Sequence, residues 1–214
     1  MDSINYNTTF GSFLSDLGSE LPAPGGGAVS GISGAFGAAL GKMVASLTCG
    51  KKKYEAYSDN TRQCMECLED MIPLFMDLSA DDASAYSGYL RAASMPKGTE
   101  TEIALRAEAM QSAIRNSANI PYKTLIACSN TLQAIEQLYG KSNQTCVGDL
   151  AAGAMELSTA ARIAWLNVLA NLPYFDDQDI AKKLYSDAYE IYQSVIKRGA
   201  ELFAAIEHDL TMKL

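Results

Sequence analysis

Histidine is nearly absent from this sequence. The 214 residues contain one, His208, close to the end of the chain. Metal sites that need two imidazoles, including the HExxH zinc motif, are therefore excluded. Acid–base chemistry elsewhere in the chain must use aspartate, lysine or tyrosine side chains.

Basic residues are also in short supply. Seventeen lysines and arginines against twenty-five aspartates and glutamates leave a formal net charge of −8, and the pI is near 4.7. A protein with a negative overall field is repelled by a phosphate backbone. We therefore expect no nucleic-acid partner.

Cysteines are few and odd in number. There are five, and a chain of this length can bury a core without disulfide bonds. Cys64-x-x-Cys67 is followed by no second pair at zinc-site spacing and preceded by no predicted strand, which favours two core thiols over a metal or redox site. We expect no bound metal and a reducing compartment, the cytoplasm.

No segment predicts secretion or a membrane span. Residues 1–6 lack the basic and apolar regions of a secretory signal. The charge-free stretch 21–41 is interrupted by prolines and glycines and has few large apolar side chains. We expect a soluble protein with this stretch buried in it and no membrane contact.

Apolar residues recur with helical spacing through nearly all of the chain after residue 27, and no alternating β-branched run predicts a sheet. We therefore expect one all-α domain over residues 1–214, a single multihelical bundle of about six or seven helices with kinked long helices. Pro73 should kink its helix, and Pro121 should break or bend its own. The expected helices are an opening helix carrying Phe10, Phe13, Leu14 and Leu17 on one face, then 28–48, 55–78, 80–93, a long helix after the capping box Thr99-x-x-Glu102, 147–171, and a last helix from about Asp176-Asp177.

One candidate site combines a glycine-rich turn with a lysine run. Gly25, Gly26 and Gly27 open a predicted helix whose free N–H groups favour anions, and Lys51-Lys52-Lys53-Tyr54 follows that helix. A tight turn and solvated lysines would explain the same residues without a ligand. The lysine run is the more informative part, because it forms a local positive patch in a negative protein.

Two more groups of polar residues have helical spacing. Asp82 and Tyr86 share a helix face, although Asp81-Asp82 also suits a helix cap. Asn167 and Asn171 share a face of an apolar helix, where amides need either inter-helix hydrogen bonds or a polar ligand. Asp149, near the start of that helix, is a cap or a second carboxylate candidate. Together these residues indicate an anion-attracting edge, a carboxylate edge and an amide pair in one helical cleft.

The chain resembles the cyclodeaminase/cyclohydrolase family of folate enzymes. The resemblance covers about the whole chain, and its first block is the most specific. The residues that carry it are Leu21-Pro22-Ala23-Pro24-Gly25-Gly26-Gly27, Met43 to Thr48, Gly50-Lys51-Lys52-Lys53-Tyr54, Asp82-Ala83-x-Ala85-Tyr86, Met95-Pro96-Lys97, Ile120-Pro121, Asn143 with Asp149, and Leu166-Asn167-Val168-x-x-Asn171-Leu172.

The resemblance implies a multihelical homodimer that acts on the carbon bridging N5 and N10 of tetrahydrofolate. A cyclohydrolase adds water to the 5,10-methenyl form and opens it to 10-formyl-tetrahydrofolate, whereas a cyclodeaminase closes 5-formimino-tetrahydrofolate to the methenyl form and releases ammonia. The substrate would be a tetrahydrofolate derivative that can carry a polyglutamate tail, and no other cofactor is implied. The 214 residues leave no room for a formiminotransferase domain, which slightly favours the cyclohydrolase.

The same resemblance implies roles for the candidate residues. Asp82 would face the cationic amidinium or orient the attacking or leaving group, Lys51 would shuttle a proton or bind the tail, and Asp149 would be the second carboxylate. The expected substrate-binding residues are Gly25, Gly26, Gly27, Lys52, Lys53, Tyr54, Tyr86, Asn167 and Asn171.

Four positions depart from the family pattern: Ala28, Ala80, Thr145 and Gly148. They support an alternative hypothesis, a non-catalytic helical protein that keeps the family fold and dimerises through its apolar helices. An open cleft lined by the lysine run, Asp82 and Asn167 would favour the enzyme, and a cleft filled by side chains would favour the alternative.

Overall fold

Six α-helices and three short 3-10 helices make up residues 8–214, the part of the chain that the computed structural model describes. Residues 1–7 lie outside the described residues. They include residues 1–6, for which the sequence predicts no secretory signal. The elements are α1 Phe10–Leu17, α2 Gly26–Ser46, η1 Lys52–Tyr57, α3 Ser58–Ala93, α4 Glu100–Leu138, η2 Gln144–Cys146, α5 Val147–Asn171, η3 Leu172–Tyr174 and α6 Gln178–Thr211. The predicted all-α class is confirmed.

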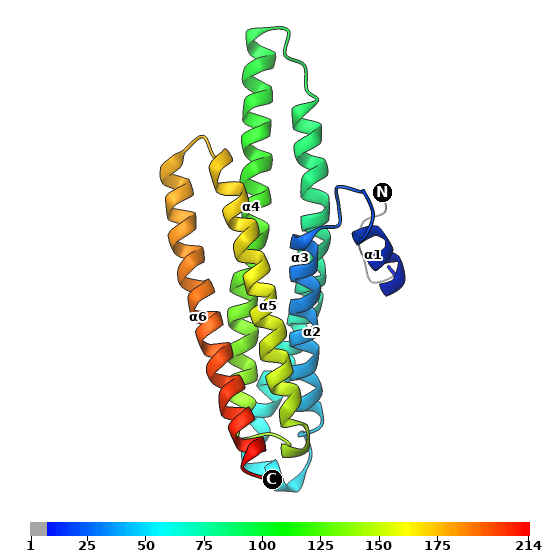
Figure 1. Ribbon diagram of the computed structural model, residues 1–214, viewed down its shortest axis with the longest axis vertical. Helices are drawn as coiled ribbons and strands as arrows, with labels where there is room; N and C mark the ends of the chain where they lie inside the picture. Colours follow the sequence, from blue (N-terminus) through cyan, green and yellow to red (C-terminus); the bar gives the residue numbers. More distant parts are fainter. Residues whose placement is uncertain (1–7) are drawn as a thin grey trace.

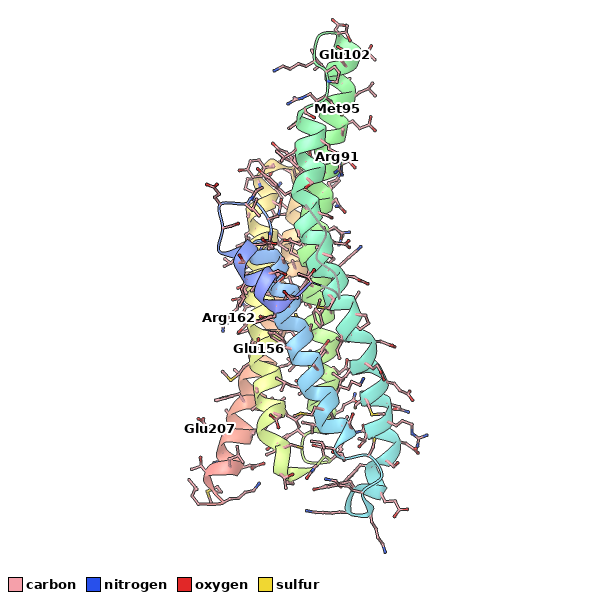
Figure 2. All side chains as sticks on the ribbon, turned by 90° about the vertical axis from the view of Figure 1, so that its right-hand side faces the viewer. Arg91, Met95, Glu102, Glu156, Arg162 and Glu207 are labelled. Atoms are coloured by element: carbon pink, nitrogen blue, oxygen red, sulfur yellow. The ribbon has the colours of Figure 1, made fainter. Side chains whose placement is uncertain are left out.

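Helix α2 packs between α3 and α5 and also contacts α4, while α6 packs on α5 and α4. The α3–α4 hairpin projects beyond the other helices (Figure 1). Arg91, Met95 and Glu102 lie near the tip of that hairpin, far from the end where the chain terminates (Figure 2).

Small residues let α2 approach its neighbours closely. A Cβ atom on Gly31 would lie 2.6 Å from the backbone oxygen of Phe75 on α3, and one on Gly37 would lie 2.7 Å from Leu157 on α5. Such distances leave no room for a side chain. Helix α2 is thus a central helix, packed closely on several sides.

Most predicted helix ends are also confirmed. Thr99 and Glu102 form the expected capping box at the start of α4. Asp177 accepts hydrogen bonds from the N–H groups of Asp179 and Ile180 and caps α6. Helix α5 has the predicted bounds, and η3 follows it at Pro173.

One predicted helix break is wrong, and of the two outcomes expected at Pro121, a break or a bend, the break does not occur. Residues 55–78 and 80–93 do not form separate helices, since α3 runs unbroken through Pro73 and through Asp81-Asp82. Asp82 is therefore not a helix cap. Helix α4 likewise continues past Pro121.

The continuity of α4 has a local cause. Pro121 has no N–H group, so the carbonyl of Ser117, four residues earlier, loses its usual helical partner. The side-chain amide of Asn171 on α5 donates to that carbonyl over 3.4 Å. Packing against α5 thus supplies the hydrogen bond that the proline removes.

Length and composition alone would allow α2 to cross a membrane. However, 61% of its most apolar window is buried inside the bundle, as in the core helix of a globular protein. The burial of this stretch agrees with the prediction made from its glycines.

Candidate active site

The carboxylate of Asp82 lies against the first turn of α2. A Cβ atom on Gly27 would come 2.0 Å from Asp82 Oδ1, so only a glycine leaves space for the carboxylate at this position. The backbone N–H of Ala28 donates a hydrogen bond to Asp82. The positive end of the α2 dipole therefore faces this side chain.

Burial dominates the electrostatics of Asp82. It raises the pKa of this carboxyl from 3.8 to about 6, against the lowering effect of the Ala28 hydrogen bond. Among residues 8–214, no lysine or arginine forms an ion pair with Asp82. A carboxylate kept half-buried without a cation costs stability, which is typical of a functional group.

The amide pair lies on the other side of the same helix start. A Cβ atom on Gly26 would be 3.8 Å from the amide nitrogen of Asn167. That nitrogen donates to the carbonyl of Ile163 over 2.9 Å, and the amide of Asn171 donates to the carbonyl of Asn167 over 2.8 Å. Both of these hydrogen bonds lie within α5, and the side-chain oxygens of Asn167 and Asn171 remain as acceptors for a ligand.

Tyr86 extends the carboxylate edge. It lies one helical turn beyond Asp82 on α3, and its side chain is half-exposed. Gly25 is the N-cap of α2 and offers no side chain to the site. The structure therefore brings together Gly25 to Gly27, Asp82, Tyr86 and Asn167, with Asn171 one turn further along α5.

The lysine run lies at the opposite end of α2. Lys51 precedes η1, and Lys52 and Lys53 begin it. The Lys53 ammonium is 5.4 Å from the centre of the Tyr54 ring, and the buried Tyr54 hydroxyl accepts the Gln144 N–H over 3.2 Å. This hydrogen bond, with Lys53 and Lys51 nearby, lowers the pKa of Tyr54.

Asp149 belongs to this lysine end as well. It lies in the first turn of α5, and both Asp149 and Lys51 act on the thiol of Cys146. Burial, followed by the charge of Asp149, raises the pKa of that thiol, while Lys51 lowers it.

The prediction of one cleft is wrong for a single chain. Helix α2 has 21 residues and so separates the two groups by about 30 Å. Asp82 and Asn167 flank its start, whereas the lysines, Tyr54 and Asp149 lie beyond its end. An open cleft lined by the lysine run, Asp82 and Asn167 was expected to distinguish an enzyme from the non-catalytic alternative. Such a cleft needs more than one copy of the chain.

Of the four departures from the family pattern, two lie near the start of α2 and two lie at its lysine end. Ala28 is buried at the start of α2, and Ala80 is half-buried on α3 near Asp82. Thr145 donates to the side chain of Asn143, and Gly148 lies in the first turn of α5 with open space around it. The backbone N–H that Ala28 offers to Asp82 does not depend on its side chain.

Sequence reasoning missed two hydroxyls at the lysine end. Thr61 Oγ1 and Ser142 Oγ are buried without a hydrogen-bond partner within residues 8–214. Nearby, Thr48 Oγ1 accepts the Asn143 N–H over 2.9 Å and ties α2 to the loop before α5. No sequence spacing marks Thr61, because its role depends on how α3 begins.

Comparison with known proteins identifies relatives of the whole chain. A family model described as formiminotransferase-cyclodeaminase matches residues 9–190. The methenyltetrahydrofolate cyclohydrolase of Methylorubrum extorquens is 34% identical over 83% of this chain and 85% of its own. The formimidoyltransferase-cyclodeaminase of Mus musculus is 28% identical over 94% of this chain, which spans 37% of that protein.

A solved structure supports the fold. The crystal structure of formiminotetrahydrofolate cyclodeaminase from Thermotoga maritima superposes with a TM-score of 0.79 and 23% identity, covering 94% of this chain and 98% of that one. At this identity the match shows the helical architecture. Together with the family model and the 34% identical relative, it leads to one conclusion: the chain belongs to the formiminotransferase-cyclodeaminase family.

Proposed function

We propose that the protein is an enzyme of folate one-carbon chemistry, a methenyltetrahydrofolate cyclohydrolase or formiminotetrahydrofolate cyclodeaminase, with its reacting centre at Asp82. The observation that carries the proposal is the half-buried carboxylate of Asp82, set against Gly27 without a cationic partner among residues 8–214. The relative that is 34% identical over most of both chains favours the cyclohydrolase. The non-catalytic alternative gains no support from this geometry.

The methenyl carbon is part of a cationic amidinium, and Asp82 supplies the missing opposite charge. In the hydrolytic direction, Asp82 takes a proton from water as the water oxygen bonds to the bridging carbon. The bond from this carbon to N5 then breaks as Asp82 returns its proton to N5, and the hydroxyl on the carbon loses its own proton to solvent as it becomes the carbonyl of the formyl group on N10. A group with a pKa of about 6 can both accept and return a proton near neutral pH.

The cyclodeaminase reaction uses the same centre. N10 attacks the carbon of the protonated formimino group and loses its proton to Asp82, and the bond from this carbon to the departing NH2 group breaks as Asp82 returns that proton, which releases ammonia and leaves the cationic methenyl bridge. The backbone groups of Gly25 to Gly27 and the amide oxygens of Asn167 and Asn171 would orient the pterin, and Tyr86 would provide a stacking surface. No cofactor other than the folate substrate is needed.

An absorbance assay of the methenyl chromophore tests the proposal. Purified protein should accelerate loss of the chromophore from methenyltetrahydrofolate above the uncatalysed rate. Addition of formiminotetrahydrofolate should instead produce the chromophore if the protein is a cyclodeaminase. Absence of both changes would contradict an enzymatic role and favour the helical-scaffold alternative.

The pH dependence of the reaction should report the pKa of the Asp82 carboxyl. Its carboxylate form stabilises the amidinium, so kcat/KM should fall as the pH drops through about 6, the value set by burial in the free enzyme. The cationic substrate favours the carboxylate, so the corresponding limb in kcat should lie at lower pH. A profile with no limb between pH 5 and 7, about one unit either side of that pKa, would contradict Asp82 as the acid–base group.

We also propose that the protein is a homodimer whose copies pack antiparallel along α2. The outward face of α2 and α5 exposes large apolar side chains: Phe36, Met43, Leu47, Met155 and Leu166. The lysine run lies beyond the end of α2 and Asp82 beside its start, so a second copy turned by a two-fold axis and antiparallel along α2 would place opposite charges near each other. Such a dimer would bring the lysines of one chain to Asp82 of the other.

Substitution of Met43 by aspartate should abolish the dimer, because a charge would be buried in an apolar interface. We expect light scattering after gel filtration to give the mass of a monomer for Met43→Asp and of a dimer for the wild type. Leu105→Asp, at the exposed start of α4, is the matched control and should remain dimeric. A wild-type monomer would refute this part of the proposal.

Mixing two inactive variants tests whether the lysines act across the dimer. Asp82→Asn and Lys51→Gln chains, combined after unfolding, form heterodimers in which one of two sites carries neither substitution. Activity should return to about a quarter of the wild-type value, since half of the dimers are mixed and half of their sites are intact. No recovery would mean that Lys51 does not serve the partner's Asp82.

A further inference from the structure

A hollow of about 450 Å³ opens at the lysine end, between the end of α2 and the start of α3. Its wall includes Lys51 and Lys52 from the segment around η1, and Ser58 and Thr61 from the first turn of α3. Glu55 is the one carboxylate among the lining residues. Two lysines against one glutamate leave the wall net positive.

Thr61 stands out among the buried threonines. It is 1% exposed, and its hydroxyl has no hydrogen-bond partner within residues 8–214. The hydroxyls of Thr48, Thr124 and Thr131 each donate to the carbonyl four residues earlier. The equivalent residue for Thr61 is Tyr57, which precedes α3 and has non-helical backbone angles (φ −111°, ψ 11°).

The start of α3 adds a second source of positive potential. Helix α3 has 36 residues, and Tyr57 at its N-cap provides no side-chain hydrogen bond. The first-turn N–H groups of a long helix carry partial positive charge. These groups, the Thr61 hydroxyl and the two lysines therefore all favour the same kind of ligand, a small group with negatively charged oxygens.

We propose that this hollow binds an oxyanion, a carboxylate or phosphate group, through Lys51, Lys52 and the hydroxyl of Thr61. The hydroxyl donates to the bound oxygen and so gains the partner that it lacks. Where the proposed folate function holds, the physiological oxyanion is a carboxylate of the substrate's glutamate tail. A free inorganic anion offers the same chemistry, and the probes below separate the two sources.

Calorimetric titration with inorganic phosphate and, separately, with tri-γ-glutamate measures the site directly. Thr61→Val keeps the shape of the side chain but removes the hydrogen-bond donor. It should weaken binding by about tenfold or more, because a hydrogen bond to a charged group usually contributes that much to affinity. Lys51→Gln should also weaken binding and reduce its salt dependence. Glu55→Gln should strengthen it by removing the one opposing charge.

Lys182→Gln is the control, because this exposed lysine of α6 pairs with Asp179 and lies outside the hollow. It should leave the binding of both probes unchanged. Thr61→Val should also fold well, because it removes an unsatisfied buried group; its Tm without anion should exceed that of the wild type by about 2–4 °C. Added anion should then raise the Tm of the wild type more than that of Thr61→Val.

Each result bears on the site. Binding of tri-γ-glutamate alone identifies the tail as the source, binding of phosphate alone identifies a free anion, and binding of both supports the shared chemistry. Equal affinity in the wild type and Thr61→Val, or no saturation by either probe up to about 10 mM, would overturn the proposal. Because neither probe contains a pterin, failure here is separate from failure of the methenyl assay.

Discussion

Replacement of Gly31 by alanine should lower the stability of the protein by about 2 kcal/mol or more. The new Cβ atom would lie 2.6 Å from the backbone oxygen of Phe75 and 2.8 Å from Cβ of Ser79. Neither atom can rotate away as the end of a flexible side chain could, so α2 and α3 must separate. The better helix propensity of alanine offsets about 1 kcal/mol of the cost.

Thermal unfolding at fixed protein concentration measures this change. A loss of about 2 kcal/mol corresponds to a Tm lower by about 4–8 °C in a chain of this size. Gly148→Ala is the matched control, since this helical glycine of α5 has nothing within 4 Å of an added Cβ atom. Its stability should be unchanged or higher by up to about 1 kcal/mol. Equal Tm values for the wild type and Gly31→Ala would show that the two helices are not packed as closely as described.

The helices were predictable because their causes are local. The capping box at Thr99 and the cap at Asp177 need neighbours within four residues, and both are present as predicted. The break expected between residues 78 and 80 does not occur, nor does a break at Pro121, because such outcomes depend on tertiary packing. No local pattern indicates that Asn171 donates to the carbonyl that Pro121 leaves without a partner.

Sequence reasoning named residues on both sides of the start of α2 but not their arrangement. Asp82 and Asn167 were both identified, and they lie on either side of the start of α2. The prediction of one cleft overlooked the length of the predicted helix 28–48. That length already implied that the lysines after the helix lie far from Gly25–Gly27 before it. The sequence could not show that the Asp82 carboxylate occupies the space a Gly27 side chain would need, since this depends on the register of α3 against α2.

Asp82→Asn should separate activity from stability. In the proposed role of general base, Asp82 would contribute about 10²–10⁴-fold to the rate, so kcat/KM should fall by that factor in the methenyl assay. Asp81→Asn is the matched control, because Asp81 is adjacent in sequence but exposed. Its turnover should equal that of the wild type. Unchanged turnover in Asp82→Asn would contradict the assignment of the reacting centre.

The stability of Asp82→Asn should change in the opposite direction. The pKa of Asp82 is about 6 in the folded protein against 3.8 in the reference state, so folding favours its protonated form. The wild type therefore loses stability as the pH rises from about 4 through 6, up to about 3 kcal/mol for a shift of this size. The neutral amide lacks this cost, and urea unfolding should show the variant more stable at pH 7.5 and nearly equal to the wild type near pH 4. A variant that is less stable at pH 7.5 would mean that Asp82 holds the bundle together, and the loss of activity would then need no catalytic explanation.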